Sequence, residues 1–203
     1  MTQPMHGRHR QLGPLQKVLA AIGSVILVIV ALVLGQLLID LSPDTDTSHA
    51  PFLIAGKPGD NVDVRTFDVK LISARYASVV KSSGIDHDSS GVWVILKIRV
   101  TARAEAMLIG YAALVDKSGR TYLASDRVKQ TLVSSARTLQ PGIPVEGEVA
   151  FEIPRDAVAG ATVRFARKSG DHRMDAMANI ELPGGYELDP AAATLAPSRV
   201  VKP

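Results

Sequence analysis

The chain has 203 residues, and its hydrophobic content of 46% excludes a wholly disordered protein even though only 4% of residues are aromatic. Its formal charge of +3 comes from three basic residues that precede the first acidic one, so the remainder is neutral and has no general attraction for nucleic acid. The absence of cysteine excludes a disulfide framework, a thiol nucleophile and a thiolate zinc site, and it favours a bacterial cell envelope.

The first predicted element is an uncharged stretch of 22 residues, 18–39. As a helix it would extend for about 33 Å, which matches a hydrocarbon core of about 30 Å. Basic residues precede it and aspartates follow it, so the positive-inside rule places 1–17 in the cytoplasm as a basic tail. We therefore expect a single-pass plasma-membrane anchor with the C-terminal domain outside. The alternative, a cleaved signal peptide, would have an apolar region of roughly 7 to 15 residues.

Two segments without regular periodicity flank the expected folded domain. Residues 40–63 are rich in Pro, Asp, Thr, Ser and Gly, which predicts a flexible spacer. Residues 183–203 contain a Gly-Gly pair, a run of alanines and several prolines, which predicts a disordered C-terminal tail. The folded extracytoplasmic domain is therefore expected over 64–182.

Two segments within this domain, 92–100 and 145–153, alternate apolar and polar residues. Such alternation marks strands with one face buried and the other in solvent. The polar residues of the two strands have opposite charges and are expected to face outward, opposite each other on neighbouring strands. The residues expected to oppose each other are Lys97, Arg99, Glu146 and Glu148.

Weaker strand signals are separated by turn sequences such as Asp116–Gly119. They occupy residues 66–80, 107–115, 120–123, 162–166 and 175–182. About seven short strands with frequent turns predict an antiparallel sandwich.

Three segments combine strand alternation with turn motifs: Gly91–Val100, Ala113–Tyr122 with its D-x-x-G turn, and Leu139–Gly142 followed by Gly147–Pro154. In this order they resemble the telokin-like (DUF4352) group of bacterial immunoglobulin-like envelope domains. The resemblance spans 66–182. It implies an all-β fold, an immunoglobulin-like antiparallel β-sandwich, here preceded by one N-terminal transmembrane helix, and no established catalytic site.

Few residues offer chemistry. His172, oriented by Asp171, could serve as a general base, and Asp86, His87 and Asp88 could supply metal ligands. A polar hairpin loop and a solvated loop are the simpler interpretations, because neither segment has the spacing of a known catalytic or metal motif. The sequence therefore predicts no catalytic residue, no metal site and no cofactor.

Four apolar residues are candidates for contact with a partner. Trp93 and Ile95 lie on the face of their strand opposite the apolar one, so either a loop or the curling of the sheet covers them, or they form an exposed patch that binds a partner. Met107, Leu108 and Ile109 have the same two interpretations, because three consecutive apolar residues cannot all face one core, and of these Met107 and Leu108 are the candidates.

Three functions remain as hypotheses. The anchor, the spacer and the immunoglobulin-like pattern favour a non-enzymatic interaction module that docks onto another envelope protein. An apolar cavity between the sheets or beneath the loops would favour a binding protein for a small molecule, lipid or polymer. A hydrolase would require His172 to cluster with Asp86, Asp88 or Asp116 around a cleft.

Overall fold

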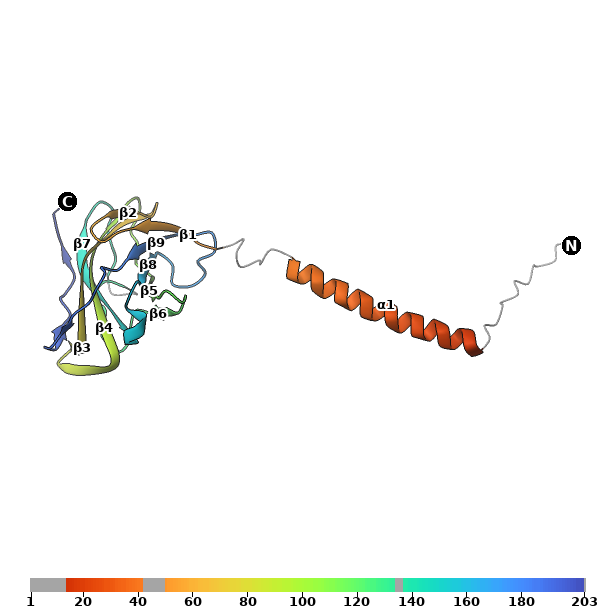
Figure 1. Ribbon diagram of the computed structural model, residues 1–203. Helices are drawn as coiled ribbons and strands as arrows, with labels where there is room; N and C mark the ends of the chain where they lie inside the picture. Colours follow the sequence, from red (N-terminus) through yellow and green to blue (C-terminus); the bar gives the residue numbers. More distant parts are fainter. Residues whose placement is uncertain (1–13, 42–49, 134–136, 203) are drawn as a thin grey trace. The chain divides into compact units, whose positions relative to one another are not determined.

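The computed structural model describes residues 14–41, 50–133 and 137–202, and the chain divides into two compact units, Met1–Ser48 and His49–Pro203 (Figure 1). Most of the predicted basic tail, 1–13, lies outside the described residues, and so do residues 42–49 of the predicted spacer.

The first unit contains helix α1 (Pro14–Leu41), a helix of 28 residues that includes the uncharged stretch 18–39. The side chains described along it are those of Leu19 and of 22–38, and nearly all of them are exposed. Among the residues with described side chains, no helix is both long enough and apolar enough to cross a membrane.

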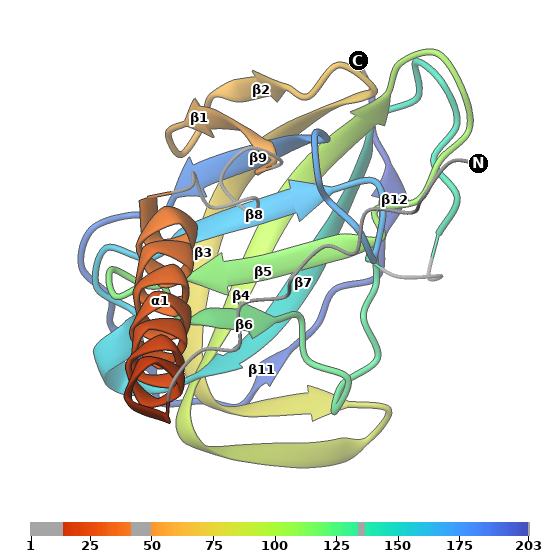
Figure 2. The ribbon, with the colours of Figure 1, turned by 90° about the vertical axis from the view of Figure 1, so that its right-hand side faces the viewer.

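The second unit is a β-sandwich, which confirms the prediction of two packed sheets (Figure 2). The five-stranded sheet has the order β1 (Phe52–Gly56), β9 (Ala176–Glu181), β8 (Thr162–Ala166), β5 (Tyr111–Val115) and β6 (Thr121–Leu123). The seven-stranded sheet has the order β10 (Leu188–Asp189), β3 (Phe67–Ser82), β4 (Ile85–Ala102), β7 (Val145–Ile153) and β12 (Arg199–Val200), with β2 (Asn61–Asp63) and β11 (Ala193–Thr194) also paired to β3. A 3-10 turn, η1 (Arg155–Ala157), follows β7.

The sandwich core lies between the two sheets and follows the predicted alternation. Every even-numbered residue from Val92 to Val100 is fully buried in it, together with Phe67, Phe151 and Phe165. Burying one such aliphatic or aromatic side chain contributes about 1.5–3 kcal/mol. The long antiparallel pairing of β3, β4 and β7 therefore forms the rigid frame on which the surface features are placed.

The prediction of a flexible spacer over 40–63 is wrong for its second half. Strand β1 pairs in parallel with β9, and β2 pairs with β3 in antiparallel orientation. The apolar run that begins at Phe52 completes the edge of the five-stranded sheet, and Val62 is only 4% exposed. These residues are held because their backbone groups satisfy strand edges that would otherwise remain open.

The prediction of a disordered tail over 183–203 is also wrong. Strands β10 and β11 pair with β3, and β12 pairs with β7 on the opposite side of the same sheet. Between them the chain crosses the outer face of the seven-stranded sheet, so residues 188–200 form what we call the C-terminal strap. The amide of Val201 still donates to the carbonyl of Pro144 at 3.0 Å. The folded domain thus includes the segment after 182.

Candidate functional sites

The outer face of the seven-stranded sheet is covered by the strap and by the 125–133 loop. Trp93 and Ile95 are both 0% exposed and belong to a small apolar cluster that is separate from the main core. The indole Nε1 of Trp93 donates to the carbonyl of His87 at 2.8 Å, and the guanidinium of Arg127 lies 5.6 Å from the ring centroid. Coverage of the face is therefore the correct interpretation, and neither side chain is available as an exposed partner contact.

Glu146 lies on this outer face beneath the strap. Arg99 is its cross-strand neighbour, as predicted, and donates to Glu146 from Nε at 3.2 Å and from Nη2 at 2.8 Å. Arg199 of the strap donates at 3.1 Å, and Nζ of Lys97 lies 3.5 Å away. The hydrogen bond from Arg99, against desolvation and with help from Arg199 and Lys97, holds the pKa of Glu146 at about 2.

The side chain of Glu148 binds the main chain of the strap. Its Oε2 accepts from the amide of Ala196 at 2.6 Å, and its Oε1 accepts from Nη2 of Arg75 at 2.9 Å. Lys97 is its cross-strand neighbour in register, as predicted. The prediction that both glutamates face solvent is wrong, because Glu146 and Glu148 are each only 5% exposed beneath the strap.

Gly147 lets Leu132 of the main core and Ser198 of the strap lie close to β7. A Cβ atom on this residue would lie 3.0 Å from Cβ of Leu132 and 3.3 Å from Cβ of Ser198. Beside it is a small hollow of about 260 Å³. Its lining is formed by Lys97, Glu146, Gly147, Glu148, Ala196, Pro197 and Arg199.

A larger hollow of about 630 Å³ lies at the loop that follows β8. We call it the loop-end hollow; it is lined by Leu108, Gly110, Arg167, Lys168, Ser169, Gly170, Asp171 and Arg173. A neighbouring hollow of about 550 Å³ shares Arg167 and Lys168 with it. These cations were not predicted as site residues, although three basic residues within seven positions of a predicted loop were a visible signal.

Each cation of the loop-end hollow already has an acidic neighbour. Lys168 lies 3.1 Å from Asp175, and Arg173 lies 2.7 Å from Asp171. Arg167 pairs with Glu105. Exposed pairs of this kind contribute little, with a median of about 0–1 kcal/mol, so the cations can exchange these partners for an incoming carboxylate or phosphate.

The segment 107–109 explains which predicted contacts remain accessible. Met107 is 4% exposed and Ile109 is buried in the core, whereas Leu108 between them is 37% exposed and lines the loop-end hollow. The period of two therefore continues through this irregular segment. Of the four predicted partner contacts, Leu108 alone is exposed, and the contact predicted for Met107 is wrong.

The residues considered for hydrolysis do not form one cluster. The ring of His172 packs against that of Tyr111 at a tilt of 57°, with centroids 4.3 Å apart, and burial lowers the pKa of His172. Asp171 accepts hydrogen bonds from Arg173 instead of orienting His172. Asp116 accepts from Ser118 and Arg120 at the β5–β6 turn, and Asp86 lies 3.5 Å from Lys81 on the β3–β4 hairpin. Within the described ranges, no group of three His, Asp or Glu side chains could hold a metal ion.

These features define the second unit as a β-sandwich domain with covered and open surface sites. No protein-family model matches the chain, and no curated protein matches it. One solved structure, an uncharacterized β-sandwich protein from Clostridium difficile 630, aligns over 70% of this chain and 100% of its own, with 9% identity and a TM-score of 0.44.

Proposed function

We propose that the chain is a membrane-anchored, non-catalytic interaction module of the bacterial cell envelope. In this proposal α1 anchors it in the plasma membrane with the N-terminus in the cytoplasm. The sandwich, immunoglobulin-like as the telokin-like resemblance implies, docks outside onto another envelope protein. The observation that carries the docking proposal is the loop-end hollow, where exposed Leu108 is surrounded by cationic side chains.

The anchor is supported by the sequence and by the length of α1. The uncharged segment 18–39 lies within a helix of 28 residues, which would extend for about 42 Å. Basic residues before the segment and aspartates after it favour a cytoplasmic N-terminus.

The chemistry of the loop-end hollow supports an acidic protein surface as the partner. Its lining includes three basic residues and one acidic residue. Arginine is also enriched at protein interfaces, whose fully buried centre is more apolar than the rest of the surface. The partner would contribute carboxylates to Lys168 and Arg173 and an apolar side chain against Leu108.

A second candidate is a binding protein for an anionic lipid or envelope polymer. The hollow's volume of about 630 Å³ lies in the range of ligand-binding pockets. The sheets themselves are packed against each other by a continuous core, so such a ligand would bind in the surface hollow and not between the sheets.

Photocrosslinking in intact membranes tests the docking. Leu108→p-benzoylphenylalanine should give a reproducible protein adduct that is lost when Lys168→Glu and Arg173→Glu are added. The control places the same group at Leu123, which is 61% exposed on β6 and outside the hollow, and should give no such adduct. Identical adducts from both positions, or a lipid or polymer adduct alone, would contradict a protein partner.

Alkaline extraction tests the anchor independently. The full chain should remain in the membrane pellet at high pH, and protease added from outside should digest the sandwich. Release of the intact chain by alkali would contradict the anchor.

A further inference from the structure

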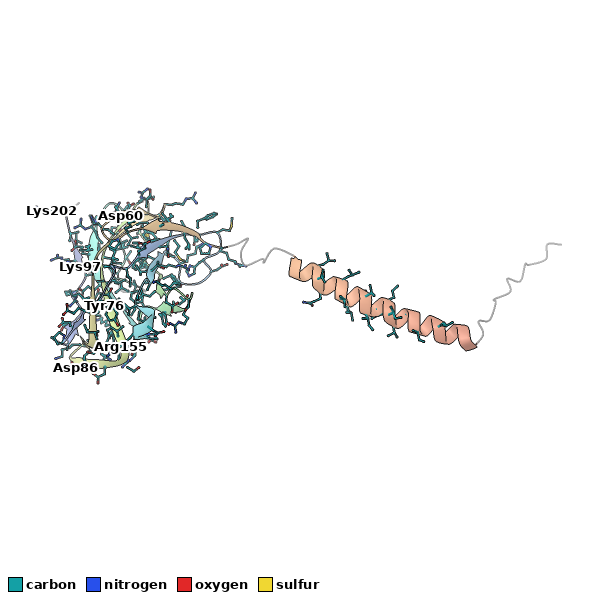
Figure 3. All side chains as sticks on the ribbon, viewed as in Figure 1. Asp60, Tyr76, Asp86, Lys97, Arg155 and Lys202 are labelled. Atoms are coloured by element: carbon teal, nitrogen blue, oxygen red, sulfur yellow. The ribbon has the colours of Figure 1, made fainter. Side chains whose placement is uncertain are left out.

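The C-terminal strap is bound to the sandwich much as a separate peptide would be. Its three strands contain two residues each, and they pair with opposite edges of the seven-stranded sheet. Between the strands, side chains of the sheet and loops hold its main chain. Arg75 donates to the carbonyl of Thr194 at 3.3 Å, and Arg137 donates to that of Ser198 at 3.1 Å. Lys97, beneath the strap, and Lys202, just beyond it, lie on the same side of the second unit (Figure 3).

The face beneath the strap offers two kinds of recognition. Its apolar part is the cluster around Trp93 and Ile95, against which Leu195 of the strap packs. Its acidic part is Glu146, which binds the guanidinium of Arg199. The strap therefore contacts this face with the apolar Leu195 and, four positions later, with Arg199.

Little of the strap packs against the main core between the sheets. Leu188 is the one strap residue packed against the main core cluster, and even this residue is only partly buried. Arg199 pairs with Glu146 while its own side chain is 67% exposed. The strap also follows Pro183-Gly184-Gly185, and Gly185 has a φ of 78°, a conformation that suits glycine at a hinge. Local opening of such a terminal segment costs less than global unfolding.

We propose that this outer face is a second docking surface, separate from the loop-end hollow, and that the strap competes for it within the chain. The occupant is an extended segment of a partner protein that presents an apolar residue four positions before an arginine. Only molecules in which the strap is open can bind this segment. The apparent affinity is therefore the intrinsic affinity multiplied by the fraction of open molecules. When the strap is released, Glu146 loses its bond from Arg199, Glu148 loses its bond from the amide of Ala196, and the apolar cluster loses Leu195.

A reversible disulfide can test this competition because the chain contains no cysteine. Thr194 of β11 and Lys81 of β3 are neighbours in register, so the double variant Lys81→Cys and Thr194→Cys should lock the strap when oxidised. The probe is a fluorescent synthetic peptide of residues 186–202, added to the purified full chain. We expect the reduced protein to bind it at least about tenfold more tightly than the oxidised protein, because locking removes the open state.

The control peptide carries Leu195→Ser and Arg199→Glu and should not bind either form. Equal binding by both forms, or no binding by the reduced form, would overturn the proposal. A variant that ends at 187 provides a second measurement: if it remains folded by circular dichroism, it should bind the probe more tightly than the full chain. A strap-exchanged dimer in sedimentation would instead identify a second copy as the occupant and overturn the assignment to another protein. Neither failure would affect the Leu108 crosslinking result.

Discussion

Glu146 and Glu148 lie on the outer face of the sheet and are nevertheless buried. Both project away from the sandwich interior, yet each is 5% exposed because the strap crosses above them. A desolvated carboxylate must be paired or hydrogen-bonded to remain charged. Glu146 meets this requirement with Arg99, Arg199 and Lys97, and Glu148 meets it with Arg75 and a backbone amide.

We predict that Glu148→Gln destabilises the protein by about 1–3 kcal/mol, because Arg75 and the amide of Ala196 lose a charged acceptor. The matched control is Glu152→Gln on the same strand, whose carboxylate pairs with Arg127 and is more exposed. Its loss should be at most about 1 kcal/mol. Urea unfolding followed by the fluorescence of Trp93 measures both, and equal losses would contradict the special role of Glu148.

Secondary-structure elements with strict alternation were predictable, and those defined by edges were not. The bounds of β7 and β8 agree with the sequence prediction, because the alternation of side chains between two faces can be recognised from the local sequence alone. Strands β10, β11 and β12 contain two residues each and gain their order from the edges of β3 and β7, which the local sequence does not reveal. Strand β1 had a signal, the apolar run at Phe52, but its Pro- and Asp-rich surroundings obscured it.

The candidate sites, too, were predictable only where the local sequence determines them. The cross-strand positions of Glu146 and Glu148 were predicted from charge and period, whereas their burial depends on strap residues that lie 48 and 53 positions further along the chain. Trp93 could not be assigned from its strand alone, since Leu195 and the 125–133 loop cover it from elsewhere.

The position of the loop after β8 depends on the absence of a side chain at Gly110. A Cβ atom there would lie 2.5 Å from the carbonyl oxygen of Arg167, which also accepts a hydrogen bond from the Gly110 amide at 3.0 Å. We therefore predict that Gly110→Ala displaces the loop, costs about 1–3 kcal/mol in stability and abolishes the Leu108 crosslink. Gly170→Ala is the control, because its Cβ would meet nothing within 4 Å. Thermal unfolding of both variants, with crosslinking yield, checks the prediction, and unchanged behaviour of Gly110→Ala would contradict it.

The carboxyl groups with lowered pKa values and His172 all respond to acid in the same direction. Hydrogen bonds from Arg173 hold the pKa of Asp171 at about 2. Burial acts to raise the pKa of Asp116, but hydrogen bonds from Ser118 and Arg120 outweigh it and hold that pKa at about 2 as well. Burial lowers the pKa of His172 from 6.5. For each of these groups the unfolded chain binds protons more readily than the folded one, so acid favours unfolding.

The pH dependence of stability should therefore have a definite shape. The depressed pKa of Glu146 contributes stability that is fully present above its ordinary value of 4.5 and is lost as the pH falls through about 2. We expect the free energy of unfolding to decline slightly below pH 6.5 as His172 becomes protonated in the unfolded chain, and steeply between 4.5 and 2. Glu146→Gln should be less stable than the wild type at neutral pH and should lose less stability over the acid interval. The two curves should therefore converge only below pH 2, where the wild-type carboxyl is mostly protonated. Urea unfolding at successive pH values measures this, and parallel curves would show that the ion pairs beneath the strap add no net stability.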